Sequence, residues 1–83
     1  MNNQHKKKIL KILGDQVRKI RLKSGISQEQ LAERANLDRT YISGIERGVR
    51  NPSFTALVNL ASGLGVTVSE LLINLEQEIN KIT

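Results

Sequence analysis

Five positions between residues 39 and 44 combine side chains and a backbone that suit contact with the edges of base pairs. A guanidinium can bond guanine O6 and N7 in bidentate fashion, and a threonine methyl group suits a thymine methyl group. Tyrosine and serine add hydroxyl groups, and a glycine lets the backbone approach a surface closely. We therefore expect base contacts in the major groove from Arg39, Thr40, Tyr41, Ser43 and Gly44.

A second group of residues suits the phosphates that flank such a groove. Free N–H groups at a helix N-terminus attract anions, and arginine binds phosphate through charge-assisted hydrogen bonds. Contacts of this kind position a protein on DNA, whereas base contacts select the sequence. We expect phosphate contacts from Ser27, Gln28, Arg47, Arg50, Asn51, Ser53 and Phe54.

Two short helices must hold these side chains. Residues 27–30 form a capping box, with a serine hydroxyl at the N-cap and a glutamine three positions later. This helix should end near Asn36, a residue type that tolerates left-handed geometry. Asp38 then begins the next helix as its N-cap, and Gly48 follows its end. Two short helices joined by a link of a few residues are typical of a helix-turn-helix.

A helix is also expected before this pair. Apolar residues recur every three or four positions from Ile9 to Ile20, which predicts an amphipathic helix that ends near Ser24. Gly14 costs that helix about 1 kcal/mol relative to alanine. The helix should therefore be weak or bent at Gly14, or begin only near Asp15.

Two helices are expected after the pair. Ser53 should cap a fourth helix that ends at Gly65. Thr67 and Glu70 repeat the capping-box pattern, and an apolar stripe then continues to Ile82 on a fifth helix. Five helices with short connections make a compact all-α domain.

The composition narrows the class of protein. The 83 residues make one domain, which we divide into a basic leader (1–12), a helix-turn-helix domain (13–75) and an extension of the last helix (76–83). The net charge of +5 is uneven, because residues 1–52 hold twelve Lys/Arg and five Asp/Glu. A basic half suggests a face for a polyanion, although ordinary surface charge would explain it equally well.

Several classes of site are excluded by the residues that are missing. The chain has no cysteine, and its single histidine, His5, lies in the lysine-rich leader. With no nucleophile–base pair and no phosphate loop, we predict no enzyme, no metal and no cofactor. No apolar run could span a bilayer and no secretory segment follows Met1, so we expect a cytoplasmic protein. Residues 6–8 should form a flexible tail, with an arm that touches DNA as the alternative.

The stretches 20–32, 37–48 and 51–53 resemble the Xre/Cro-type helix-turn-helix domain of phage repressors. Caps, glycines, core positions and spacing agree over about residues 13–75. The resemblance implies a five-helix, lambda-repressor-like fold and a dimeric transcription regulator. The run 38–43 is most similar to the controller proteins of restriction–modification systems, which are small dimers that bind operator DNA and regulate their own gene and the endonuclease gene.

The resemblance also implies an ion pair. In this family an arginine near the end of the first helix meets a glutamate near the end of the third, which assigns Arg21 and Glu46. A local reason supports the assignment, because a helix C-terminus disfavours a carboxylate and a nearby guanidinium offsets that effect.

The apolar stripe of the last helix is longer than a five-helix core can cover. We expect Leu71 and Leu72 to serve the core, and Leu75, Ile79 and Ile82 to form an isologous dimer interface. Such a dimer would place two recognition helices in successive major grooves of a roughly palindromic operator.

Two carboxylates suggest a further partner. Glu29 and Glu33 lie one helical turn apart on the second helix and should face away from DNA, where RNA polymerase could bind them. The alternative is that they only complement the helix dipole and keep the surface soluble. The competing function is an antitoxin-like protein-interaction module with autoregulatory DNA binding, which would use the exposed part of the last helix for another protein.

Overall fold

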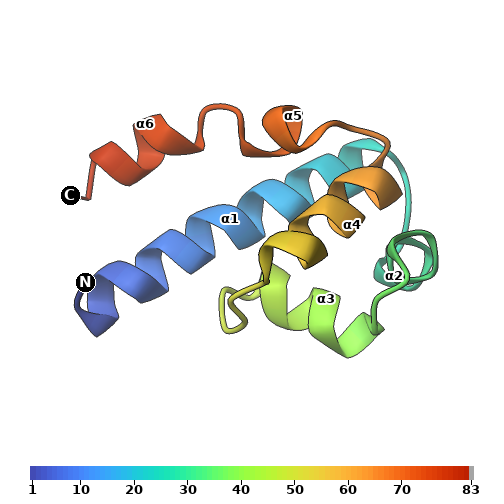
Figure 1. The fold of residues 1–83 in the computed structure, drawn as a ribbon, viewed down its shortest axis with the longest axis horizontal. Helices are drawn as coiled ribbons and strands as arrows, with labels where there is room; N and C mark the ends of the chain where they lie inside the picture. The colour runs from blue at the N-terminus through green and yellow to red at the C-terminus, as the bar shows by residue number, and fades with distance from the viewer. Residues whose placement is uncertain (83) are drawn as a thin grey trace.

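The chain is built from helices, and the computed structural model describes residues 1–82. The elements are α1 (Asn3–Lys23), α2 (Gln28–Ala35), α3 (Arg39–Glu46), α4 (Phe54–Leu64), α5 (Val68–Leu72) and α6 (Leu75–Asn80). The first helix, α1, runs along the molecule, whose longest extent is 34 Å (Figure 1). The helix-turn-helix of α2 and α3 lies on one side of it, and no strand occurs among the described residues. The predicted all-α fold is confirmed.

The predicted caps define most of the helix ends. The Ser27 hydroxyl accepts a hydrogen bond from the Gln30 amide at 3.0 Å, and the Gln30 side chain accepts one from the Ser27 amide at 2.8 Å. Thr67 and Glu70 form the same reciprocal box at the start of α5. Asn36 ends α2 in the left-handed region, at φ 56°. Asp38 occupies the N-cap position of α3, but its side chain makes no capping hydrogen bond.

An aliphatic core holds the helices together. α2 packs on α4, and α1 packs on α3. The largest fully buried side chains are Val17, Leu31, Ile42, Ile45, Leu60 and Leu71. Burial of this apolar surface is the main stabilising contribution in so small a domain.

The N-terminal half of α1 differs from the prediction. The helix begins at Asn3, where the Asn2 side chain accepts a hydrogen bond from the His5 amide at 2.8 Å, and it continues without interruption through Gly14. The predicted flexible tail is therefore wrong for residues 6–8, which are helical. Gly14 serves packing, because a Cβ there would lie 2.7 Å from the Glu46 carbonyl oxygen and closer still to that of Ile45. Only glycine allows α1 to approach the end of α3 this closely.

The single long helix predicted after Thr67 is divided into α5 and α6. Ile73 is extended and Asn74 is left-handed at φ 70°, while the Gln16 side chain donates to the Leu71 carbonyl at 3.1 Å. Because the chain turns here, α6 lies alongside the N-terminal half of α1 (Figure 1). Leu72, predicted to be core, is exposed, whereas Leu75, predicted to contact a partner, is buried within the chain. Leu71 and Leu75, four positions apart, are the buried leucines of the stripe, and Leu72 lies outside the core.

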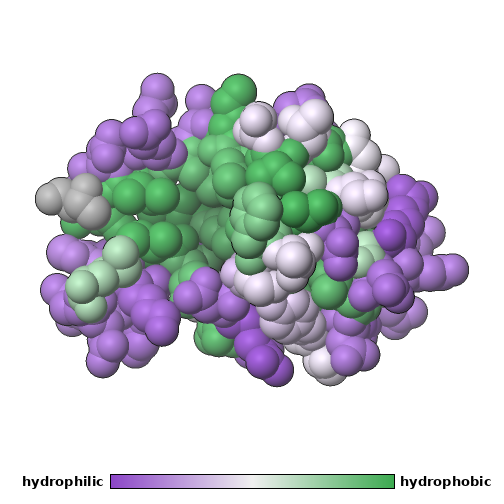
Figure 2. Space-filling view, in the orientation of Figure 1, coloured by the Kyte–Doolittle hydropathy of each residue, from purple (hydrophilic) through white to green (hydrophobic). Residues whose placement is uncertain are grey.

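The turn also leaves an apolar surface. In Figure 2 hydrophobic atoms gather between α6 and α1 and around the link from α5 to α6, while hydrophilic atoms cover the outer side of α6 and surround α2. Val58, Leu72 and Ile73 are among the large hydrophobic residues that are exposed. No single helix of residues 1–82 is long and apolar enough to cross a membrane; a joined pair, α4 with Val68–Asn80, has the length and composition but is bent by 100°.

Candidate nucleic-acid interface

The third helix, α3, is anchored by its inner face and open at its first turn. Ile42 and Ile45 are fully buried in the core. Arg39 and Thr40, on the first turn, are exposed, and Ser43 is half-buried one turn later. A rigid helix with an exposed polar first turn has the form needed to enter a major groove, where the N-terminal residues of a recognition helix contact base edges.

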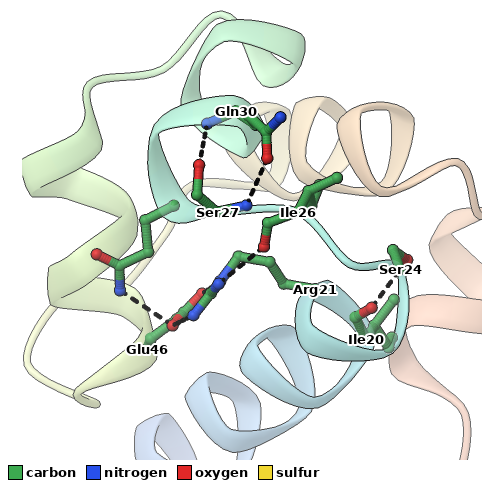
Figure 3. Close-up of polar contacts among 8 residues, drawn as sticks. Ile20, Arg21, Ser24, Ile26, Ser27, Gln30 and Glu46 are labelled. Atoms are coloured by element: carbon green, nitrogen blue, oxygen red, sulfur yellow. Dashed lines mark hydrogen bonds and ion pairs between the residues drawn. The ribbon is translucent and has the colours of Figure 1, made fainter.

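A buried ion pair fixes the other end of α3. Arg21 Nε lies 2.7 Å from Glu46 Oε2, and Arg21 Nη2 donates to Glu46 Oε1 at 3.0 Å, which makes the pair bidentate (Figure 3). The two side chains are only 10% and 3% exposed. Arg21 Nη1 also donates to the Ile26 carbonyl at 2.9 Å, and Gln28 Nε2 donates to Glu46 Oε1 at 3.1 Å. The sequence-predicted partners are thus brought together.

This network connects four parts of the chain. Its members come from α1, from the loop before α2, from the first residue of α2 and from the last residue of α3. The hydrogen bonds to Glu46, and to a smaller extent its negative charge, raise the pKa of Arg21 against the opposing effect of burial, so the guanidinium stays charged. Charged, bidentate and fully hydrogen-bonded, the pair holds α2 and α3 in a fixed relative orientation.

Gly44 has a different role from the predicted base contact. It is buried, and the place that its Cβ would occupy is filled by the side chain of Arg50, whose Cγ lies closest and whose Cβ is 3.4 Å away. The guanidinium of Arg50 continues over the ring of Tyr41, 5.6 Å from its centroid. Gly44 therefore makes room for the side chain of Arg50.

Tyr41 and Arg50 form a stacked pair that the sequence did not reveal. Tyr41 is half-buried and packs against the core, and Arg50 covers its ring from the loop after α3. A cation over an aromatic ring is stabilised by about 0.5–1 kcal/mol at an exposed site. Tyr41 and Arg50 are nine positions apart in the chain, and no local sequence pattern connects residues at that spacing. The available signal for their contact was Gly44, a glycine on α3 that faces the loop.

Several of the residues predicted to bind phosphate also make hydrogen bonds at the helix ends. Ser27 and Ser53 accept capping hydrogen bonds from the amides of Gln30 and Ala56. Arg47 Nε donates to Ser43 Oγ at 3.3 Å, which joins the end of α3 to its middle. The remaining members of the set, Arg50, Asn51 and Phe54, are exposed.

The other predicted partner surfaces lie elsewhere. Glu29 and Glu33 are exposed on α2. Ile79 and Ile82 are half-buried near the C-terminal end, and Ile73, which precedes α6, is exposed. The acidic pair and the apolar surface are carried by different helices.

Comparison with known proteins identifies the family. A family profile described as helix-turn-helix matches residues 17–71. The control protein C.MunI of a Mycoplasma species is 46% identical over 66 residues, spanning 78% of this chain and 89% of C.MunI. C.BamHI of Bacillus amyloliquefaciens is 50% identical over 62 residues, spanning 74% of this chain and 76% of C.BamHI.

A solved structure agrees in three dimensions. The protein C.Esp1396I, crystallised with a 19-base-pair DNA duplex, superposes with a TM-score of 0.78 at 44% identity over 86% of this chain and 95% of that one. C.Esp1396I is a restriction–modification controller protein. The chain therefore belongs to the helix-turn-helix family, among the restriction–modification control proteins.

Proposed function

We propose that this chain regulates transcription by binding operator DNA as a dimer, in the manner of a restriction–modification control protein and without enzymatic activity. The observation that carries the proposal is the exposed first turn of α3, with Arg39 and Thr40 at the surface and the far end of the helix locked by Arg21 and Glu46. The relative C.Esp1396I, bound to duplex DNA, supports it.

Within the interface we assign base contacts to Arg39, Thr40 and Ser43, with Tyr41 at the edge of the groove. Phosphate contacts fall to the remaining set, namely Ser27, Gln28, Arg47, Arg50, Asn51, Ser53 and Phe54. Gly44 is removed from the base-reading set because the side chain of Arg50 covers it.

A gel-shift titration against DNA from upstream of the protein's own gene tests this assignment. Arg39→Ala should weaken binding by about 1–3 kcal/mol and relax the preference at one base pair in each half-site. Arg47→Ala should weaken binding to all sequences alike, since it removes a phosphate contact. Lys23→Ala is the matched control, because Lys23 lines the groove between α1 and α5, away from α3. The assignment is wrong if the two arginine variants have the same sequence preference.

The apolar surface supports dimerisation. We assign the isologous interface to Leu72 and Ile73, which are exposed, together with Ile79 and Ile82, which are half-buried. Leu75 contributes indirectly by packing α6 on α1. Ile73→Asp should give folded monomers in sedimentation and weak operator binding, whereas Val49→Asp, at an equally exposed apolar residue beside Arg47, should leave the dimer intact. A wild-type protein that sediments as a monomer at high micromolar concentration would exclude this interface.

The acidic spot on α2 supports activation through RNA polymerase. Glu29 and Glu33 are exposed, and carboxylates gain nothing from nearby phosphates. Glu33→Lys should preserve operator binding, or strengthen it slightly, and abolish stimulation of an adjacent promoter in a transcription assay. Wild-type stimulation by this variant would show that α2 has only a structural role.

A further inference from the structure

We propose that one face of α1 is a second DNA-binding element, in which a basic strip of Lys7, Lys11 and Arg18 continues from Arg47 and binds phosphates beyond those contacted by α2, α3 and the following loop. The inference rests on the proposed function and deepens it. Its residues lie largely in the leader, for which the helix-turn-helix pattern itself assigns no role.

The helical period places the strip on one face of α1. Lys7, Lys11, Gly14, Arg18 and Arg21 follow one another at intervals of four, three, four and three residues, so their side chains share one face of a continuous helix. Two members show where that face points. Gly14 lies against the last carbonyl groups of α3, and Arg21 bonds to Glu46 at its end. The basic face of α1 is therefore turned toward α3.

Two adjoining hollows make the strip continuous with the proposed interface. The first, of about 500 Å³, is lined by Lys6, Lys7 and Lys11 on α1 and by Arg47 and the loop after it. The second, of about 320 Å³, is lined by Lys11, Arg18 and Arg47 together with Gln28 and Ser43. Lys11 and Arg47 line both hollows, so positive charge runs from the recognition helix onto α1. Glu46, the carboxylate that lines the second hollow, is paired with Arg21.

The strip is held in place before any ligand arrives. Gly48, at φ 77°, packs so closely that a Cβ on it would lie 2.9 Å from the Lys11 Cα, which fixes α1 against the loop after α3. The Lys11 ammonium lies 2.8 Å from the Asp15 carboxylate, and both side chains are more than half exposed. An exposed pair of this kind contributes about 0–1 kcal/mol, so a phosphate can replace Asp15 as the partner of Lys11. Duplex DNA presents one negative charge about every 1.7 Å along its axis, so phosphates are available to a row of cations that lies beside a recognition helix.

The test compares two double variants with the same loss of charge. Lys7→Ala/Lys11→Ala removes two of the three cations of the strip, and Lys19→Ala/Lys23→Ala removes two lysines that line the groove between α1 and α5. Alanine favours helix at all four positions, so α1 should stay folded, which circular dichroism checks. Binding to duplex DNA from upstream of the gene is measured over a range of salt concentrations, and the contacted phosphates are mapped by ethylation interference.

The strip variant should lower the steepness of log K against log salt by about 1.8 per subunit, and at about 0.1 M salt weaken binding about eightfold for each lysine. It should also lose a set of interfering phosphates while keeping the base preference of the wild type. The control variant should retain the full set of phosphates and nearly the wild-type slope. Equal losses in both double variants, or an unchanged phosphate map, would overturn the inference. Failure of the proposed function itself has a different signature, since Arg39→Ala would then leave sequence preference unchanged.

Discussion

Removal of one member of the Arg21–Glu46 pair should cost far more free energy of unfolding than removal of both. In Arg21→Met the Glu46 carboxylate stays 3% exposed and keeps only the hydrogen bond from Gln28, while the Ile26 carbonyl loses its donor. An uncompensated buried charge costs about 3–5 kcal/mol. At about 0.05–0.15 kcal/mol per residue, the whole domain has a stability of about 4–12 kcal/mol. The single variant should therefore be close to unfolding, or unfolded, at room temperature.

The double variant Arg21→Met/Glu46→Leu should be much less affected, because apolar side chains of similar size can replace a buried ion pair at little cost. Urea denaturation followed by circular dichroism measures all three proteins, with Lys11→Ala as a control in which only the exposed Asp15 pair is lost. Small and equal losses in the single and double variants would refute the reasoning.

The structure makes three further predictions about stability. Gly14→Ala should lower the free energy of unfolding by about 1–3 kcal/mol or more in urea denaturation, since the new Cβ would meet two carbonyl groups of α3. As a control, Asp15→Ala on the exposed side of α1 should change the free energy of unfolding by less than about 0.5 kcal/mol. Asn74→Val should lower the free energy of unfolding by about 1–2 kcal/mol, because a β-branched residue resists φ 70°, whereas Asn74→Gly should leave it nearly unchanged. Thermal unfolding measures both variants, and equal thermal midpoints would contradict the role given to this turn. The hydrogen bond that the Thr67 amide donates to the Glu70 carboxylate, together with the neighbouring Thr67 side chain, lowers the pKa of Glu70. The stabilising contribution of Glu70 should therefore be present above the ordinary value of 4.5 and be lost as the pH falls through the lowered one, and Glu70→Gln should remove this part of the pH dependence of the thermal midpoint.

Local signals in the sequence predicted local structure well. The two capping boxes and the left-handed Asn36 need only residues that are neighbours in the chain, and all are present. Asp38 takes its predicted position without its predicted hydrogen bond. Local chemistry thus predicted the ends of α2 and α3, the two helices that carry the proposed interface, and the starts of α4 and α5.

The structure differs from the sequence-based predictions where residues that are far apart in the chain contact each other. Gly14 was interpreted as a weak point of α1, because its low helix propensity is visible in sequence while the carbonyl groups of α3 that require it are not. The break at Asn74 interrupts a good apolar stripe, and its causes are a left-handed residue and hydrogen bonds from Gln16, which is 55 residues from Leu71.

In the proposed interface, too, local features were predicted from the sequence and contacts between distant segments were not. The exposure of Arg39 and Thr40 followed from the helical period, and the Arg21–Glu46 contact was implied by the family resemblance. The stacking of Arg50 on Tyr41 joins a loop to a helix, and no periodic pattern reports such a contact. The packing role of Gly44 was missed for this reason, since the side chain that fills its space comes from the loop.

The buried network around Arg21 and Glu46 contains residues that the fold requires, and it lies apart from the exposed residues that can be substituted at little cost in stability. Its four bonding residues, drawn from α1, α3 and the segment leading into α2, depend on one another for satisfied hydrogen bonds, so a change in one favours a compensating change in another. Arg39 and Thr40 lie at the opposite end of α3 and are exposed. Substitutions there should alter the preferred operator at little cost in folding. A gene duplication could therefore diverge toward a new set of target promoters on an unchanged framework, which would let related regulators coexist in one cell without cross-talk.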